Sequence, residues 1–254
     1  MKTVTLNGIS LAYERRGTGT PLVLIHGYPL DHTIWDEVAT LLEDTFDVIM
    51  PDMRGFGASA ASYDDYSMDD MAGDIAGLLE SLGVEKAAVV GHSMGGYIAL
   101  AFARLFPTHI SGLGLVSSQA AADPPERKQG RYDTANQINE KGVRVASEAM
   151  TPKLSSDPEV QTSVKALIEK QPAAGLIGAL KAMAERGDSA SLLSLLKYAV
   201  VIVHGTADEL IPVSRGREMK EMVPHATYIE LNGVGHMPMM EAADRTAGTL
   251  KSLK

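Results

Sequence analysis

Short, nearly unbroken apolar runs recur along the chain and restrict its fold more than any other feature. They lack the polar alternation of a strand with one face in water, and they are rich in valine, leucine and isoleucine. Such runs are typical of strands buried on both faces of a parallel sheet. The runs are residues 22–26 (LVLIH), 48–50 (VIM), 87–91 (AAVVG), 113–118 (LGLVSS) and 199–205 (AVVIVHG).

Helical patterns separate these runs. In residues 67–83 the apolar side chains are spaced by three and four, which predicts a helix. Ser67 is the candidate N-cap of this helix, and Gly83 is the candidate residue just beyond its C-terminal end. At the amino-terminal end, Asn7-Gly8 lies between two alternating segments and indicates an antiparallel hairpin at the sheet edge. The sequence therefore predicts an α/β fold whose sheet is mixed but mostly parallel.

The segment 119–196 interrupts this alternation of strands and helices. It contains several prolines and helical patterns but no strand-like run. We expect residues 1–118 and 197–254 to form the core, and 119–196 to form an inserted helical cap whose inner face lines an acyl pocket. A set of ordinary crossover helices is the alternative.

The stretch VVGHSMGGYIAL, residues 89–100, places Ser93 at the point where a strand gives way to a helix. It contains the pattern G-x-S-x-G of a nucleophile elbow, in which a sharp turn projects the serine hydroxyl above the sheet. Gly91 and Gly95 remove side chains that would collide with the neighbouring strand and helix. A glycine-rich helix start is the alternative interpretation.

A serine nucleophile needs a general base, and the base needs a carboxylate to orient it. His236 follows the last predicted strand and so belongs to the same sheet edge as Ser93, whereas His225 precedes that strand. Asp208 follows a buried strand and lies between serine and histidine in chain order. We predict a triad of Ser93, Asp208 and His236.

Other candidates fit the triad less well. Glu209 adjoins Asp208 and is the alternative acid. Asp52 also follows a strand, but its surroundings, PDMRGFGAS, favour a tight turn organised by an aspartate and an arginine among glycines. His204 closes a strand beneath the acid loop, which favours a structural role.

An oxyanion hole needs two fixed N–H donors. Met94, directly after the serine, supplies one, and Tyr28 in LVLIHGYPL supplies the other, since Pro29 has no N–H to donate. We expect Tyr28, Met94 and Met237 to contact the substrate as well. Several methionines near these positions favour an apolar, adaptable pocket over one built for charged substrates.

Composition excludes several classes of function. The net charge of −9 and the lack of a dense basic run argue against nucleic acid and anionic membranes as partners. With no cysteine, disulfides and cysteine-ligated metals are excluded, and we predict neither a metal nor another cofactor. The first residues, MKTVTLNGISLAY, lack the apolar region of a signal peptide, so we expect a cytoplasmic protein. The oligomeric state is left open.

The ordered motifs HGYP, DMRGFGAS, GHSMGG, GTADELIP and GVGH resemble those of the α/β-hydrolase superfamily along the whole chain. The chain looks similar to bacterial carboxylesterases, enol-lactonases and cofactor-free haloperoxidases or perhydrolases. The resemblance implies an eight-stranded sheet with helices on both faces, a helical cap after the sixth strand, and the triad named above. Carbon–carbon hydrolases of this fold typically have Trp after the catalytic histidine, whereas Met237 follows His236 here.

We therefore expect a serine hydrolase that cleaves carboxylic esters, through an acyl-enzyme on Ser93, for a small-molecule substrate. A lactonase or enol-lactonase is the nearest alternative. A small-molecule receptor or scaffold on the same fold is an alternative of a different class, and a soluble lyase with the same triad is a further one.

Pro29 generates a prediction of its own. By restricting Tyr28 to extended conformations, it sets where the Tyr28 carbonyl points, and a carbonyl aimed into the site would hold hydrogen peroxide for attack on the acyl-enzyme. We expect some peracetic acid from an acetate ester and peroxide, and a lower ratio of peracid to hydrolysis in Pro29→Leu. Equal ratios in the two proteins would show that Pro29 does not matter, and finding no peracid that depends on Ser93 would end the hypothesis.

Overall fold

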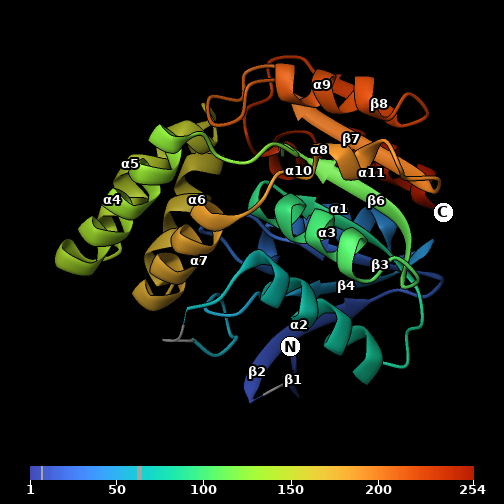
Figure 1. The fold of residues 1–254 in the computed structure, drawn as a ribbon, viewed down its shortest axis with the longest axis horizontal. Helices are drawn as coiled ribbons and strands as arrows, with labels where there is room; N and C mark the ends of the chain where they lie inside the picture. The colour runs from blue at the N-terminus through green and yellow to red at the C-terminus, as the bar shows by residue number, and fades with distance from the viewer. Residues whose placement is uncertain (7, 62–64) are drawn as a thin grey trace.

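The computed structural model describes residues 1–6, 8–61 and 65–254, and its centre is an eight-stranded sheet (Figure 1). The strand order is β1-β2-β4-β3-β5-β6-β7-β8. Strands β3 to β8 are parallel, whereas β2 is antiparallel to β1 and β4. This confirms the predicted mostly parallel sheet. The strands are β1 (Lys2–Leu6), β2 (Ile9–Arg16), β3 (Thr20–Ile25), β4 (Phe46–Pro51), β5 (Ala87–His92), β6 (Ile110–Val116), β7 (Ala199–Gly205) and β8 (Thr227–Leu231).

The apolar runs become the central strands. Every residue of β4 and β5 is buried, and so is every residue of β7 except its first. Burial on both faces requires apolar side chains at successive positions, which is why these strands read as continuous runs. The β1–β2 hairpin forms the sheet edge as predicted, and Asn7 of its predicted turn lies outside the described residues.

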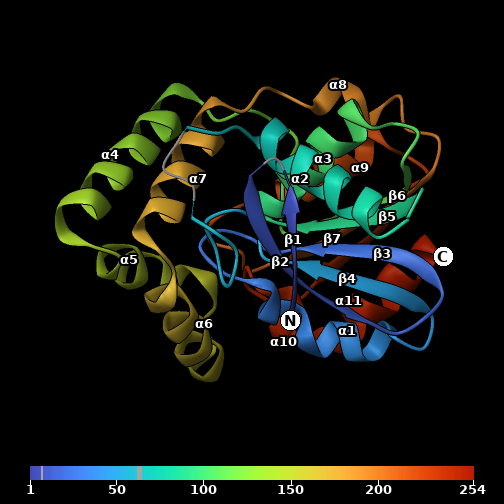
Figure 2. The same ribbon diagram turned by 90° about the horizontal axis from the view of Figure 1, so that it is seen from below.

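Helices cover both faces of the sheet, as the resemblance implied (Figure 2). Helix α2 begins after Ser67, whose hydroxyl accepts from the Asp70 N–H while the Asp70 carboxylate accepts from the Ser67 N–H. One face carries α1 (Asp36–Leu42), α10 (Pro238–Glu241) and α11 (Ala243–Leu250), and the other carries α2 (Met68–Ser81), α3 (Met94–Leu105) and α9 (Ser214–Met222). Among the described residues, none of the helices combines the length and the apolar character needed to cross a membrane.

Four helices between β6 and β7 form a separate group, which we call the cap helices. They are grouped beyond the ends toward which the arrows of β6 and β7 point (Figure 1). The short helix α8 (Ala190–Leu193) contacts α9 instead, so the expected cap segment 119–196 includes a part that packs on the core. The cap helices are α4 (Pro125–Lys141), α5 (Arg144–Leu154), α6 (Pro158–Lys170) and α7 (Ala173–Glu185).

The cap helices meet the core where two backbones come very close. A Cβ added to Gly175, near the start of α7, would lie 1.7 Å from the carbonyl oxygen of Gly55 in the loop after β4. Close by, the Gly57 N–H donates to the side chain of Gln171 at 2.8 Å, and the Gln171 amide donates to Asp31 at 3.2 Å. Docking of the cap helices therefore depends on a glycine at position 175.

We expect Gly175→Ala to lower the free energy of unfolding by roughly 1–3 kcal/mol, because the new methyl group overpacks a backbone contact. Gly73 is a matched control, since it lies inside α2 with nothing within 4 Å of an added Cβ. Gly73→Ala should raise the free energy of unfolding by up to about 1 kcal/mol through helix propensity. Urea denaturation measures both, and a Gly175→Ala protein as stable as Gly73→Ala would contradict the contact.

Candidate active site

Ser93 occupies a strained turn between β5 and α3. Its φ and ψ of 52° and −112° are unusual for a residue with a side chain. A Cβ on Gly91 would lie 2.0 Å from the carbonyl carbon of Gly95, and a Cβ on Gly95 would lie 2.4 Å from the carbonyl oxygen of Ile25 in β3. Only glycines allow this approach. The Ser93 N–H donates to the Val116 carbonyl at 2.9 Å, which fixes the turn to the next strand.

Asp208 and His236 are in contact at the carboxyl edge of the sheet. Nδ1 of His236 lies 2.8 Å from one carboxylate oxygen of Asp208 and donates to it. The other carboxylate oxygen accepts the N–H groups of Leu210 and Ile211, each at 2.9 Å. Burial opposes ionisation of Asp208, but the attraction and hydrogen bond of His236 outweigh it and hold its pKa below the ordinary value. This arrangement leaves Nε2 of His236 as the proton acceptor.

His92 connects His236 to the nucleophile elbow, a role that the sequence argument missed. It immediately precedes Ser93, and its Nε2 donates to the backbone carbonyl of His236 at 2.8 Å. The two imidazole rings are 4.8 Å apart. Burial and the neighbouring His236 hold the pKa of His92 well below its usual range, so its ring is neutral. Its place inside the elbow motif was the only available signal.

The remaining candidates lie where their surroundings give them other roles. Glu209 is exposed, so Asp208 is the acid that meets His236. His204 is fully buried and donates to the Ile211 carbonyl at 2.8 Å, which supports the loop that carries Asp208. His225 is exposed and lies 3.1 Å from the Tyr198 carbonyl, immediately before β8.

The two expected oxyanion donors lie at the ends of neighbouring strands. Met94 is the first residue of α3, where the helix itself offers no acceptor for the N–H. Tyr28 lies in the turn after β3, which closes with a 3.0 Å bond from the Leu30 N–H to the Gly27 carbonyl. Within the part of the chain that is described, the Tyr28 N–H has no hydrogen-bond acceptor.

A cavity of about 340 Å³ adjoins Ser93 and Tyr28. The side chains of Met94 and Met237 are fully buried at helix starts and do not line the cavity, contrary to the expectation that both contact the substrate. The methionines that line it are Met150 and Met183. Most of the lining surface is apolar, as expected, but three cations, which the sequence argument did not anticipate, also line the cavity. Its lining comprises Tyr28, Ser93, Tyr97, Arg127, Gly130, Arg131, Thr134, Ala146, Ala149, Met150, Lys153, Leu180, Met183, Leu210 and Ile211.

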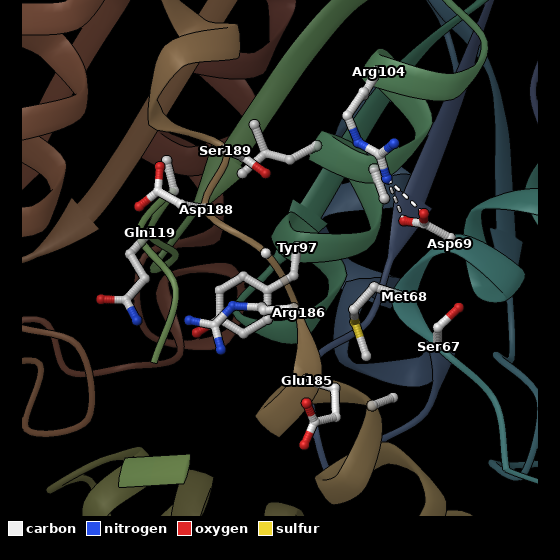
Figure 3. Close-up of a pocket in the computed structure, with 15 residues that line it drawn as sticks. Ser67, Met68, Asp69, Tyr97, Arg104, Gln119, Glu185, Arg186, Asp188 and Ser189 are labelled. Atoms are coloured by element: carbon white, nitrogen blue, oxygen red, sulfur yellow. Dashed lines mark hydrogen bonds and ion pairs between the residues drawn. The ribbon is translucent and has the colours of Figure 1, made fainter. Parts of the chain in front are cut away.

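Tyr97 lines both this cavity and a second one of about 210 Å³, which Figure 3 shows. The guanidinium of Arg186 covers the Tyr97 ring at 3.9 Å, and Arg104 pairs with Asp69 at the far side of the second cavity. The residues that line the second cavity include no member of the predicted triad. The cavity at Ser93 is therefore the candidate active site.

Asp31, His32 and Asp52 form a compact group whose oxygen and nitrogen atoms lie within 4.8 Å of one another. Protein donors already occupy these atoms. Asp52 accepts from the backbone N–H and Nδ1 of His32, at 2.9 and 2.7 Å, and from Ala58 N–H at 2.8 Å. The group thus organises the loop after β4, the structural role expected for Asp52, and the absence of a metal stays a prediction.

Comparison with known proteins shows the family. Residues 20–243 match the family model described as the alpha/beta hydrolase fold. An esterase from Thermogutta terrifontis, solved with malate bound, aligns with a TM-score of 0.94 and 35% identity over 98% of this chain and 96% of that one. An enol-lactonase from Burkholderia xenovorans LB400 aligns at 0.91 with 24% identity over 99% of both chains.

Lipase 3 from Moraxella sp. (strain TA144) is 28% identical across 100% of this chain and 84% of the lipase. The chain belongs to the α/β-hydrolase family. Its esterase and lipase relatives support an enzyme that hydrolyses esters.

The two candidate bases lie beyond opposite ends of β8: His225 precedes the strand and His236 follows it. We expect His236→Ala to lose ester turnover, because His236 is the histidine that meets Asp208, while His225→Ala stays within about twofold of wild type as an exposed residue should. Hydrolysis of p-nitrophenyl acetate by the purified variants measures both. An active His236→Ala protein would show that the base lies elsewhere.

Proposed function

We propose that this protein is a carboxylic-ester hydrolase that acts through an acyl-enzyme on Ser93. The Asp208–His236 pair carries the proposal, because it adjoins a serine elbow that lines a cavity. A neutral imidazole oriented by a buried, ionised carboxylate is the general base that a serine hydroxyl requires. The 35% identical esterase supports this class of substrate.

In the proposed mechanism, Nε2 of His236 removes the proton from the Ser93 hydroxyl as its oxygen attacks the ester carbonyl carbon. The N–H groups of Tyr28 and Met94 stabilise the oxyanion of the tetrahedral intermediate. His236 then protonates the leaving alcohol, and the acyl group remains on Ser93. Water, deprotonated by the same imidazole, attacks the acyl-enzyme and releases the acid.

Asp208 contributes by remaining charged throughout this cycle. Its lowered pKa keeps the carboxylate ionised near neutral pH, so that it stabilises the imidazolium that forms when His236 takes the proton. His204 and the N–H groups of Leu210 and Ile211 hold the loop and the carboxylate in place. The base is thereby fixed in one tautomer before the substrate binds.

The cap helices supply the acyl-pocket wall in this proposal, since α4, α5 and α7 all contribute to the lining. A lactone is an ester closed into a ring, and the same groups would open it by the same steps.

The peroxide reaction at Pro29, the cytoplasmic location and the exclusion of nucleic acid and membrane partners stay predictions.

Ser93→Ala tests the proposal. Turnover of p-nitrophenyl acetate should fall by roughly 10⁴-fold, because loss of the nucleophile removes the acyl-enzyme route. Circular dichroism and thermal unfolding should match wild type, since Ser93 lines the cavity. A folded Ser93→Ala protein that retains more than about a tenth of the activity contradicts the assignment.

A further inference from the structure

Three cationic side chains line the cavity at Ser93. Arg127 and Arg131 lie one turn apart on α4, and Lys153 lies near the end of α5. Of the described residues that form the lining, none is aspartate or glutamate. This is unexpected for a chain with a net charge of −9.

One buried carboxylate balances only part of this charge. Asp123, whose carboxyl group is fully buried, pairs with Arg131, with Arg186 at 2.8 Å and with Arg127 at 3.7 Å. Burial opposes its ionisation, but the hydrogen bond and charge of Arg131 outweigh this and lower the pKa of Asp123. Three guanidinium groups thus share a single negative charge, and Lys153 adds another positive charge at the cavity.

Hydrogen-bond donors also outnumber acceptors at this wall. Among the residues that the structure describes, the Leu210 carbonyl, at 3.3 Å, is the one hydrogen-bond acceptor of Arg127 Nη2. Nη1 of Arg131 faces the sulfur of Met183, a weak acceptor, at 3.2 Å. The buried Tyr28 hydroxyl, which feels the positive charge of Arg131, has no acceptor in the described parts of the chain. Lys153 is exposed and Arg127 half-buried, so the cavity is open to solvent on this side. Donors with few protein acceptors at the wall of an open cavity favour an anionic acceptor as ligand.

We propose that the substrate of this site carries a carboxylate in addition to its ester bond, held by Arg127, Arg131 and Lys153. Half-esters of dicarboxylic acids and lactones with a carboxylate side chain have this chemistry. The inference rests on the proposed ester hydrolysis at Ser93. Because the whole chain is strongly negative, the preference comes from local pairing inside the cavity rather than from long-range attraction.

A matched pair of esters tests the proposal. p-Nitrophenyl hydrogen adipate carries a free carboxylate, and p-nitrophenyl methyl adipate has the same chain with that carboxylate capped. We expect wild type to favour the charged ester in kcat/KM by about tenfold or more, mainly through KM, as a charge-assisted contact worth about 1.4 kcal/mol would give. A variant whose catalysis is impaired in general loses activity on the neutral ester as well. The ratio of kcat/KM for the charged ester to kcat/KM for the neutral ester therefore isolates the contribution of the carboxylate.

Variants of the cations locate the effect. Lys153→Met and Arg127→Met should each lower the ratio at least about threefold, and the double variant should bring it near one. Lys165→Met is the control, because Lys165 is exposed on α6 and lines neither cavity described above. It should keep the wild-type ratio. Arg131 is left intact because it hydrogen-bonds directly to the buried Asp123, whereas Arg127 lies 3.7 Å from that carboxylate.

Two results overturn the proposal: a wild-type ratio of one or less, or a double variant whose ratio equals that of Lys165→Met. These failures differ from failure of the proposed function. If Ser93→Ala abolishes cleavage of the neutral ester and the charged ester is not preferred, only the carboxylate inference is wrong. If cleavage of both esters is independent of Ser93, the hydrolase mechanism itself is wrong.

Discussion

The close approach of α3 to β5 and β3 determines the position of the other parts of the site. A Cβ at Gly91 or Gly95 would lie 2.0 or 2.4 Å from the nearest backbone atom, which is too close. The helix and the strands can therefore approach this closely only because these two residues have no side chain. That contact forces Ser93 into its unusual conformation and places the Met94 N–H at the start of the helix. The strain is tolerated because buried strands on both sides hold the turn, and it fixes the position of Ser93, the proposed nucleophile.

The cap helices depend on a different kind of contact. An isolated buried carboxylate is strongly unfavourable, so Asp123 needs its arginines, and those arginines come from both ends of the helical group, α4 and the residue after α7. The same ion cluster that ties these helices together also sets the charge of the cavity wall. Arg131 therefore both stabilises the cap helices and contributes positive charge to the cavity wall, so replacing it would affect both.

Much of the core could be predicted because buried parallel strands and the elbow have local signatures. The run 199–205 corresponds residue for residue to β7, and the position of a residue after a strand distinguished His236 from His225. The contents of the cavity could not be predicted in this way. Arg127 and Lys153 lie on helices whose sequence does not show which side faces Ser93. The methionines indicated the apolar part of the pocket but gave no sign of its cations.

The backbone of His236 is held from two directions. Its carbonyl accepts the His92 ring N–H, and its own N–H donates at 2.9 Å to the carbonyl of Leu154, the last residue of α5. The loop that carries His236, the proposed general base, is thus held between the elbow and the cap helices. If these helices were exchanged for those of a relative, the residue that accepts the His236 N–H would be replaced together with the pocket wall. In such a chimera of this protein, the support of His236 would change together with the pocket, although the exchanged segment contains none of the residues proposed for the triad.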